Sequence, residues 1–206
     1  MRSRLNLPVY IAFCGIPKSG KSLVQEILLQ NYGVQPVDDG AILREIAIKH
    51  FGASQAQVET QEGKATLAHW PNGDAMIDVA TGQHMTWRQV LGQLGNRLES
   101  LFGKYVMPMT ACARLGNQPG PFSFGSVRRD QGRYYQQHGG IIVEIVNPQA
   151  QPTGNEFDTY DASICDYRIM NDGLARGLAP AVARVDLERK LHELMLEIHF
   201  KALKAA

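Results

Sequence analysis

The stretch Gly15–Ser22 reads GIPKSGKS and directly follows the short apolar run VYIAFC at Val9–Cys14. Its spacing fits G-x-x-x-x-G-K-[ST], in which a glycine-rich loop joins a strand to a helix and its backbone N–H groups surround phosphate oxygens. The next twelve residues, KSLVQEILLQNY, place apolar side chains at helical spacing and end before Gly33, a favoured C-cap residue. The sequence therefore predicts a strand, a phosphate-binding loop and a helix over residues 9–33.

Segments of strand and helix character alternate along the rest of the chain. Short β-rich runs lie at 34–37, 122–127, 141–146 and 167–170, and helical patterns lie at 41–51, 86–103, 105–115, 128–140 and 180–204. Residues 53–84 read as helix fragments and a loop or hairpin. Alternation of this kind predicts an α/β fold with a parallel β-sheet flanked by helices, as in P-loop NTPases. We expect one domain over residues 1–206, in which about residues 53–115 form a helical insertion.

The helix predicted over residues 86–103 has the clearest local signals. Thr86 is a good N-cap residue for this helix. One apolar face is expected to contain Val90, Leu91, Leu94, Leu98 and Leu101.

Composition and charge narrow the classes of function. The 206 residues include 21 basic and 20 acidic side chains, and the resulting net charge of +1 argues against a strongly basic nucleic-acid-binding surface. Cys14, Cys112 and Cys165 form no CxxC pair and no Cys/His metal pattern, so we expect reduced cysteines. No apolar run reaches the roughly 18 residues that span a bilayer, and MRSRLNLP lacks the apolar core of a secretory signal. We therefore expect a cytoplasmic protein with no membrane partner.

The phosphate-loop motif assigns roles to its own residues. Lys21 is expected to reach the β- and γ-phosphate oxygens, and the Ser22 hydroxyl is expected to bind Mg²⁺, which prefers oxygen ligands. The predicted cofactors are ATP and Mg²⁺. The predicted nucleotide-binding residues are Gly15, Ile16, Pro17, Lys18, Ser19, Gly20, Lys21, Ser22 and Leu23.

A phosphate loop alone does not name a reaction. The chain has no NKxD motif of a guanine-specific switch protein and no LSGGQ motif of a transporter ATPase. A short chain with one α/β domain favours a small kinase, which aligns two substrates and neutralises charge on the transferred phosphoryl group. Such an enzyme needs arginines near the acceptor and a carboxylate for the metal or the acceptor hydroxyl.

Five segments in a fixed order carry a resemblance to a known family. After GIPKSGKS come VDDGAILREIAIKHFG, VETQEGKA, TWRQVLGQLGNRLESLFG and SVRRDQGRYYQQHGGIIVEI. This order resembles the bacteriophage deoxynucleoside monophosphate kinases, within the wider P-loop nucleotide kinase group that includes thymidylate and adenylate kinases. The resemblance extends over roughly residues 9–173. It implies ATP- and Mg²⁺-dependent transfer to a deoxynucleotide by one P-loop kinase domain over residues 1–206. In such a domain, about residues 53–115 would form a mobile helical lid or acceptor-binding insertion beside the sheet.

The resemblance, together with position at predicted strand ends, selects residues for the acceptor side. Arg128 and Arg129 follow a predicted strand, and ligands of open α/β sheets collect at the carboxyl ends of strands. Asp38 and Asp39 also end a predicted strand, where one carboxylate would activate the acceptor hydroxyl or hold Mg²⁺ through water, or would only serve a turn. The expected catalytic residues are Lys21, Asp38, Asp39 and Arg128, and the expected acceptor-binding residues are Arg44, Arg88, Arg128 and Arg129. Weaker candidates are Glu62, Lys64, Glu156 and Asp158.

One departure from the family keeps the acceptor open. The family usually carries an acid where this chain has Ser126, and it tends to have another near Gly132. The first hypothesis is a kinase acting on free deoxynucleoside monophosphates. The second is a kinase that phosphorylates the hydroxymethyl group of 5-hydroxymethyluracil within phage DNA, with the base held by Trp87, Tyr134 or Tyr135, although core aromatics are the plainer interpretation. The third is an ATP-binding module without kinase activity.

The expected partners follow from these hypotheses. They are a nucleotide substrate or DNA containing 5-hydroxymethyluracil, and the interpretation also allows a homodimer. A phage protein of this kind would work in the host cytoplasm.

Overall fold

A computed structural model gives the fold, and it describes residues 5–152, 154 and 158–205. The chain forms two compact units. The first, here called the sheet unit, comprises Met1–Asp38 and Leu115–Ala206; the second, the helical unit, comprises Asp39–Arg114. The helical unit contains most of the insertion expected at about 53–115, and its action as a lid stays a prediction.

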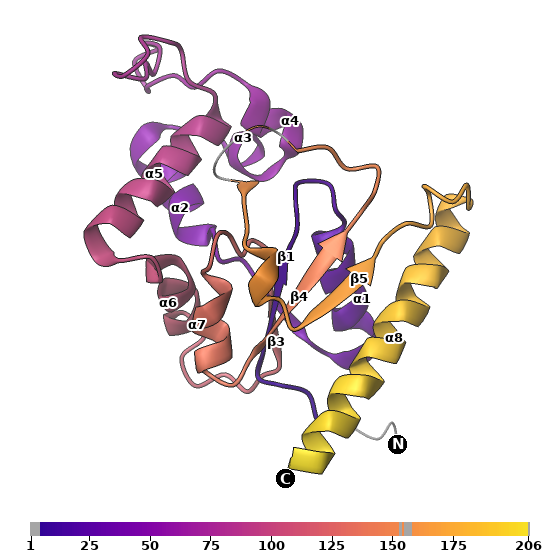
Figure 1. Cartoon of the computed structure of the whole chain (residues 1–206). Helices are drawn as coiled ribbons and strands as arrows, with labels where there is room; N and C mark the ends of the chain where they lie inside the picture. Colours follow the sequence, from indigo (N-terminus) through magenta and orange to yellow (C-terminus); the bar gives the residue numbers. More distant parts are fainter. Residues whose placement is uncertain (1–4, 153, 155–157, 206) are drawn as a thin grey trace. The chain divides into compact units, whose positions relative to one another are not determined.

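The sheet unit is built on one parallel β-sheet (Figure 1). Its strands are β1 (Tyr10–Cys14), β2 (Gln35–Val37), β3 (Phe122–Phe124), β4 (Ile141–Val146) and β5 (Tyr167–Met170). The strand order is β2-β3-β1-β4-β5, and all four neighbouring pairs are parallel. The chain therefore builds the sheet on one side of β1 and then on the other, which confirms the predicted α/β fold and makes the end of β1 a topological switch point.

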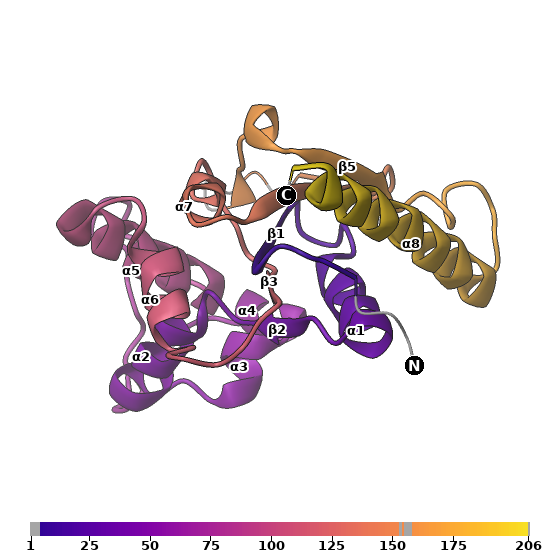
Figure 2. The same cartoon turned by 90° about the horizontal axis from the view of Figure 1, so that it is seen from below.

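Helices cover both faces of this sheet. The helices α1 (Lys21–Tyr32) and α8 (Pro180–Ala205) pack on one face, and α7 (Gly132–Gln137) lies on the other (Figure 2). Apolar side chains of β1, β4 and β5 meet those of α1 and α8 in one continuous core. On the α7 face, the ring of Tyr135 packs against Phe124 and Tyr10, with centroids 4.2 and 6.0 Å apart. These two layers fix β1, so the loop that follows it starts from a rigid strand.

The helix after the phosphate loop has the bounds that the sequence predicts. It runs from Lys21 to Tyr32 and ends at Gly33, whose φ of 71° lets its N–H bond the carbonyls of Leu28 and Leu29. The predicted strands at 141–146 and 167–170 and the helix at 41–51 are confirmed as well.

The helical unit has a core of its own. Its helices are α2 (Ala41–Phe51), α3 (Gln55–Glu59), α4 (Gln61–Ala65), α5 (Trp87–Phe102) and α6 (Val106–Ala113). The Trp87 ring is 1% exposed and lies in a cluster with Leu43, Val58 and Met107. Between α4 and α5, antiparallel bridges join Leu67 to Thr86 and Ile77 to His84, so the predicted loop or hairpin is a short irregular hairpin.

The start of α5 follows its predicted signals, but its apolar face is shorter than predicted. Thr86 and Gln89 form a reciprocal capping box at the N-terminus. The last buried residue of α5 is Gly95, and Leu101 is 73% exposed, so the prediction that Leu101 shares the buried face is wrong. Leu94 and Leu98 are partly buried against the core of the helical unit, and Leu101 lies outside that core.

The third strand also ends early. The run predicted as a strand over residues 122–127 stops at Phe124. There the Gln25 amide of α1 donates to the Ser123 carbonyl at 2.9 Å, and its side chain lies against Gly125. Across the described part of the chain, no helix combines the length and the apolar character needed to cross a membrane.

Candidate nucleotide site

The loop Gly15–Gly20 takes a conformation that only glycine tolerates at two positions. Gly15 has φ of +144° and Gly20 has φ of +104°. A Cβ atom at Gly15 would lie 2.5 Å from the carbonyl oxygen of Ile145 in β4. Lys18 also has a positive φ, 66°, which is uncommon for a residue with a side chain and is typical of strained functional loops. The motif therefore forms a tight backbone cradle at the carboxyl end of the central strand.

The side chain of Lys21 lies over this cradle. Its Nζ atom donates to the carbonyl oxygens of Gly15 at 2.5 Å and Ile16 at 3.0 Å, and to Ser19 Oγ at 3.4 Å. A phosphate oxygen carries negative charge, so it attracts the Lys21 ammonium group more strongly than these neutral carbonyl oxygens do. An anion that enters the cradle therefore meets a cation that is already aimed at it.

The start of α1 supplies the second anion-binding element. The first N–H groups of this twelve-residue helix face the loop, and its dipole adds positive potential there. Ser22 is exposed, and among the described residues its hydroxyl makes no hydrogen bond. The described residues hold no cluster of three or more His, Cys, Asp or Glu side chains suited to a metal. The exposed hydroxyl of Ser22 fits Mg²⁺, which commonly takes one or two protein oxygens and completes its shell with phosphate oxygens and water.

Two asparagines that the sequence analysis missed hold the cradle from the sheet. Asn147 follows β4 and donates to the Lys18 carbonyl at 3.2 Å, and Asn171 follows β5 and donates to the Ser19 carbonyl at 2.9 Å. A lone Asn after a strand carries no motif, so only the parallel pairing of β1, β4 and β5 brings these amides to the loop. They satisfy two backbone carbonyls of the loop and so fix its conformation.

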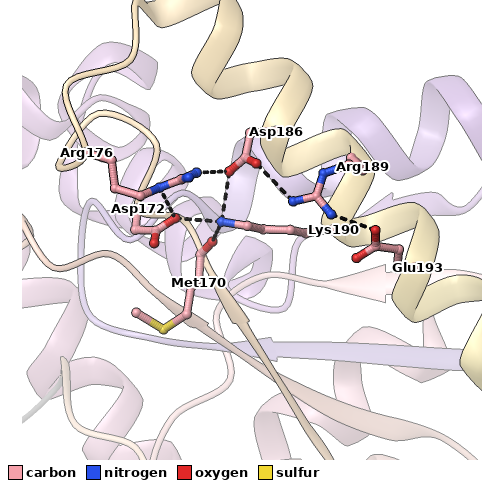
Figure 3. Close-up of polar contacts among 7 residues, drawn as sticks. All are labelled: Met170, Asp172, Arg176, Asp186, Arg189, Lys190 and Glu193. Carbon is pink, nitrogen blue, oxygen red and sulfur yellow. Dashed lines mark hydrogen bonds and ion pairs between the residues drawn. The ribbon is translucent and has the colours of Figure 1, made fainter.

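Ion pairs on α8 hold the chain around Asn171 (Figure 3). The Lys190 ammonium donates to Asp172 Oδ1 at 2.6 Å and to the Met170 carbonyl at 2.9 Å, and it lies 2.8 Å from Asp186 Oδ2. Arg176 pairs with Asp172 and Asp186, and Arg189 pairs with Asp186 at 3.1 Å. Partial burial acts against the charged form of Lys190, but the two carboxylates outweigh it and raise the pKa of Lys190. The segment after β5 is therefore tied to α8 by a network rather than by one exposed pair.

This network predicts an acid-sensitive contribution to stability. Hydrogen bonds from Lys190 and Arg189 lower the pKa of Asp186 to about 2 from its ordinary value of 3.8. A lowered folded-state pKa stabilises the fold above the ordinary pKa, and the effect disappears as the pH falls through the folded pKa. We expect Asp186→Asn to lower the midpoint temperature of unfolding by a few degrees at pH 6, with the difference shrinking between about pH 4 and pH 2. Thermal scans of both proteins over this pH range test it, and a difference that stays constant with pH would contradict it.

The predicted Arg128–Arg129 segment follows β3 at the same edge of the sheet as the phosphate loop. Its backbone is held by the segment before β5: Arg129 N donates to the Thr159 carbonyl at 2.8 Å, and Arg129 has φ of 45°. The Tyr160 hydroxyl in turn donates to the buried carboxylate of Glu144 at 2.7 Å. Burial and this hydrogen bond raise the pKa of Tyr160. The sheet therefore anchors the strained turn that carries the two arginines, and Glu144 is another residue that no sequence motif indicated.

The other predicted acceptor residues fall into the two units. Asp38 is the exposed residue that ends the first segment of the sheet unit, and Asp158 lies in the same unit. Glu156 lies outside the described residues. The helical unit holds Asp39, Arg44, Glu62, Lys64 and Arg88. Within it, Asp39 is buried and Arg88 donates to Gln61 Oε1. The phosphate loop, Arg128 and Arg129 thus belong to one sheet edge, whereas a common acceptor site for all these residues stays a prediction.

The aromatic residues considered for a DNA base lie mostly in the cores. Trp87 and Tyr135 are each 1% exposed, so the interpretation as core residues is confirmed for both. Tyr134 is half-buried, with its ring stacked near His138 at a centroid distance of 4.2 Å. No ring face of Trp87 or Tyr135 is available for a flipped base.

The three cysteines form no disulfide in this structure, but two of them meet, and their reduced state stays a prediction. The Cys14 and Cys165 sulfur atoms are 3.1 Å apart, directly before the phosphate loop. The hydrogen bond to Cys165 and burial raise the pKa of the Cys14 thiol. No sequence pattern indicated this contact, because 151 residues separate the two positions.

No protein-family model matches this chain, and no curated protein matches it. Among solved structures, shikimate kinase from Aquifex aeolicus aligns with a TM-score of 0.41 and 16% identity, over 94% of this chain and 98% of that one. Shikimate kinase from Acinetobacter baumannii in complex with shikimate aligns with a TM-score of 0.42 and 16% identity, over 95% and 97%. Similarity at this level does not indicate which reaction the protein catalyses.

Proposed function

We propose that the protein is an ATP- and Mg²⁺-dependent kinase that transfers the γ-phosphoryl group to a deoxynucleotide, most simply a deoxynucleoside monophosphate. One observation carries the proposal: Lys21 lies over a two-glycine backbone cradle at the end of the central parallel strand. That is where α/β sheets bind ligands, and where a loop of N–H groups and a helix terminus favour phosphate.

In this role the chain contributes position and charge rather than covalent chemistry. The loop N–H groups orient the phosphates, and Lys21 stabilises the negative charge that develops as the γ-phosphoryl group leaves. Ser22 holds the metal, which neutralises phosphate charge when bound. Arg128 and Arg129 contact the acceptor or the transferred group. The phosphate of a deoxynucleoside monophosphate is largely ionised at pH 7 and attacks without losing a proton, so Asp38 or Asp39 would hold Mg²⁺ through water. Each of these assignments on the acceptor side is part of the proposal.

The choice of a deoxynucleotide has two supports. The order of segments resembles the phage deoxynucleoside monophosphate kinases, and a pair of arginines follows β3 at the sheet edge of the phosphate loop. Arginine suits a phosphate-bearing acceptor, because its planar guanidinium binds phosphate oxygens in pairs. The burial of Trp87 and Tyr135 removes two of the three rings considered for a DNA base, which favours the free nucleotide over the polymer.

A labelled-phosphate assay separates the candidates. The protein is incubated with Mg²⁺, γ-³²P-ATP and either the four deoxynucleoside monophosphates or duplex DNA containing 5-hydroxymethyluracil. We expect label in at least one deoxynucleoside diphosphate. Label in the DNA alone would replace the free-nucleotide acceptor by the base in DNA. ATP hydrolysis without a labelled acceptor in either arm would contradict kinase activity on deoxynucleotides and favour the ATPase module.

A further inference from the structure

We propose that Asn171 is a positioning residue of the nucleotide site, and that Lys190 of α8 acts through Asn171 to hold the phosphate loop in its binding conformation. This inference depends on the proposed nucleotide site but assigns a new role to α8, a helix outside the motif. It makes the loop's shape depend on one amide and one ammonium group.

The side chain of Asn171 contacts the phosphate loop directly. The Asn171 amide donates to the carbonyl of Ser19, whose own side chain is fully buried. The same amide nitrogen occupies the space next to Gly20, since a Cβ atom at Gly20 would lie 2.3 Å from it. The amide therefore touches the two residues directly before Lys21. A change in its position shifts the backbone from which Lys21 and Ser22 extend.

Asn171 is itself held in place by β4 and by Lys190 of α8. Its backbone N–H donates to the Val146 carbonyl at 2.7 Å, which continues the pairing of β4 and β5. Lys190 bonds the residue on each side of it, the Met170 carbonyl and the Asp172 carboxylate (Figure 3). One side chain of α8 thus holds both neighbours of Asn171.

Two carboxylates keep the ammonium group of Lys190 in place. Asp172 and Asp186 both bind its ammonium, and Arg176 bridges the same two carboxylates. The Lys190 side chain is only 21% exposed, so the group is better shielded from solvent than a typical surface ion pair. Its loss removes the bond to the Met170 carbonyl and leaves Arg176 as the cation that the two carboxylates still share, which weakens the hold of α8 on the segment of Asn171.

The proposed action of Asn171 and Lys190 on the phosphate loop, here called the clamp, is tested first without any nucleotide. We compare hydrogen–deuterium exchange of the wild-type protein with Asn171→Asp, which keeps the side-chain shape but cannot donate to Ser19, and with Lys190→Met. The proposal predicts exchange about 10-fold faster in the loop and first turn of α1, residues 15–24, for Asn171→Asp, and a smaller increase for Lys190→Met. Lys190→Arg, which keeps charge and donors, should restore near wild-type exchange. The control Arg184→Met removes an ion pair of α8 with Glu26 of α1 and should leave residues 15–24 unchanged.

The second readout is the affinity for a non-hydrolysable ATP analogue with Mg²⁺. We expect Asn171→Asp to raise the dissociation constant roughly 10-fold and Lys190→Met about 3-fold. In the Asn171→Asp background, Lys190→Met should add less than about 2-fold, because its effect passes through Asn171. A merely structural role would lower the unfolding temperature of these variants without this non-additive loss of affinity.

The two readouts separate the inference from the proposed function. Normal exchange of residues 15–24 in both Asn171→Asp and Lys190→Met would overturn the clamp, whether or not the protein binds ATP. Full additivity of the two substitutions in the affinity measurement would also overturn it. Altered exchange together with no nucleotide binding by the wild-type protein would instead support the clamp and contradict the proposed function.

Discussion

Lys21→Ala is expected to lower the rate of phosphoryl transfer by about 10³-fold. The Nζ atom of Lys21 is bonded to the Gly15 and Ile16 carbonyls and lies over the cradle, where we propose that the oxygens of the transferred group bind. Removing one preorganised donor from such a site costs about 10²–10³-fold, and a full positive charge belongs at the upper end of that range. Transfer from γ-³²P-ATP, measured at saturating acceptor, gives the result directly.

The matched control for this prediction is Lys201→Ala. Lys201 is an exposed lysine of α8 that lies over the ring of Tyr167, 5.5 Å from its centroid. Its replacement removes the same charge from the same unit, so its transfer rate should stay within about 2-fold of wild type. If Lys21→Ala transfers phosphate as fast as this control, the loop is not the catalytic phosphate site.

Gly15→Ala is expected to abolish high-affinity nucleotide binding. The new Cβ atom would lie 2.5 Å from the Ile145 carbonyl oxygen, and backbone of a central strand cannot move away cheaply. The φ of +144° adds strain of about 1–3 kcal/mol for a residue with a side chain. The contact with the Ile145 carbonyl and the backbone strain can be relieved only if the loop opens. We expect this opening to weaken ATP binding by at least about 30-fold in an equilibrium titration.

Gly33→Ala separates this steric effect from backbone strain alone. Gly33 also has a positive φ, 71°, but a Cβ atom there would meet nothing within 4 Å. We expect this variant to lose about 1–2 kcal/mol of stability and to keep wild-type affinity for ATP. Equal affinity of Gly15→Ala and Gly33→Ala would show that the close approach of Gly15 to β4 does not shape the site.

The parts of the structure that depend on local signals were predictable. The bounds of α1 follow from the motif before it and from Gly33 after it, and the start of α5 follows from Thr86 and Gln89. Both ends are determined by capping residues that lie within a few positions of them, so the local sequence alone indicates these ends. The parallel sheet followed from alternation, although its strand order came only from the structure.

The parts that depend on distant contacts were not predictable. Asn147, Asn171 and Glu144 look like ordinary loop or strand residues until the sheet brings them to the loop or to Tyr160. Leu101 has the right helical spacing, but burial depends on whether another helix reaches that turn. The acceptor residues share this difficulty, because their roles require a second substrate and a defined placement of two units.

Binding of Mg²⁺ and a non-hydrolysable ATP analogue to the wild-type protein and to Lys21→Ala tests the central claim most directly. A calorimetric titration should show one saturable site in the wild-type protein and an affinity at least about 10-fold weaker in Lys21→Ala, with both proteins folded. Absence of binding by the folded wild-type protein, or equal affinity of the two proteins, would contradict the assignment of Gly15–Ser22 as the ATP site.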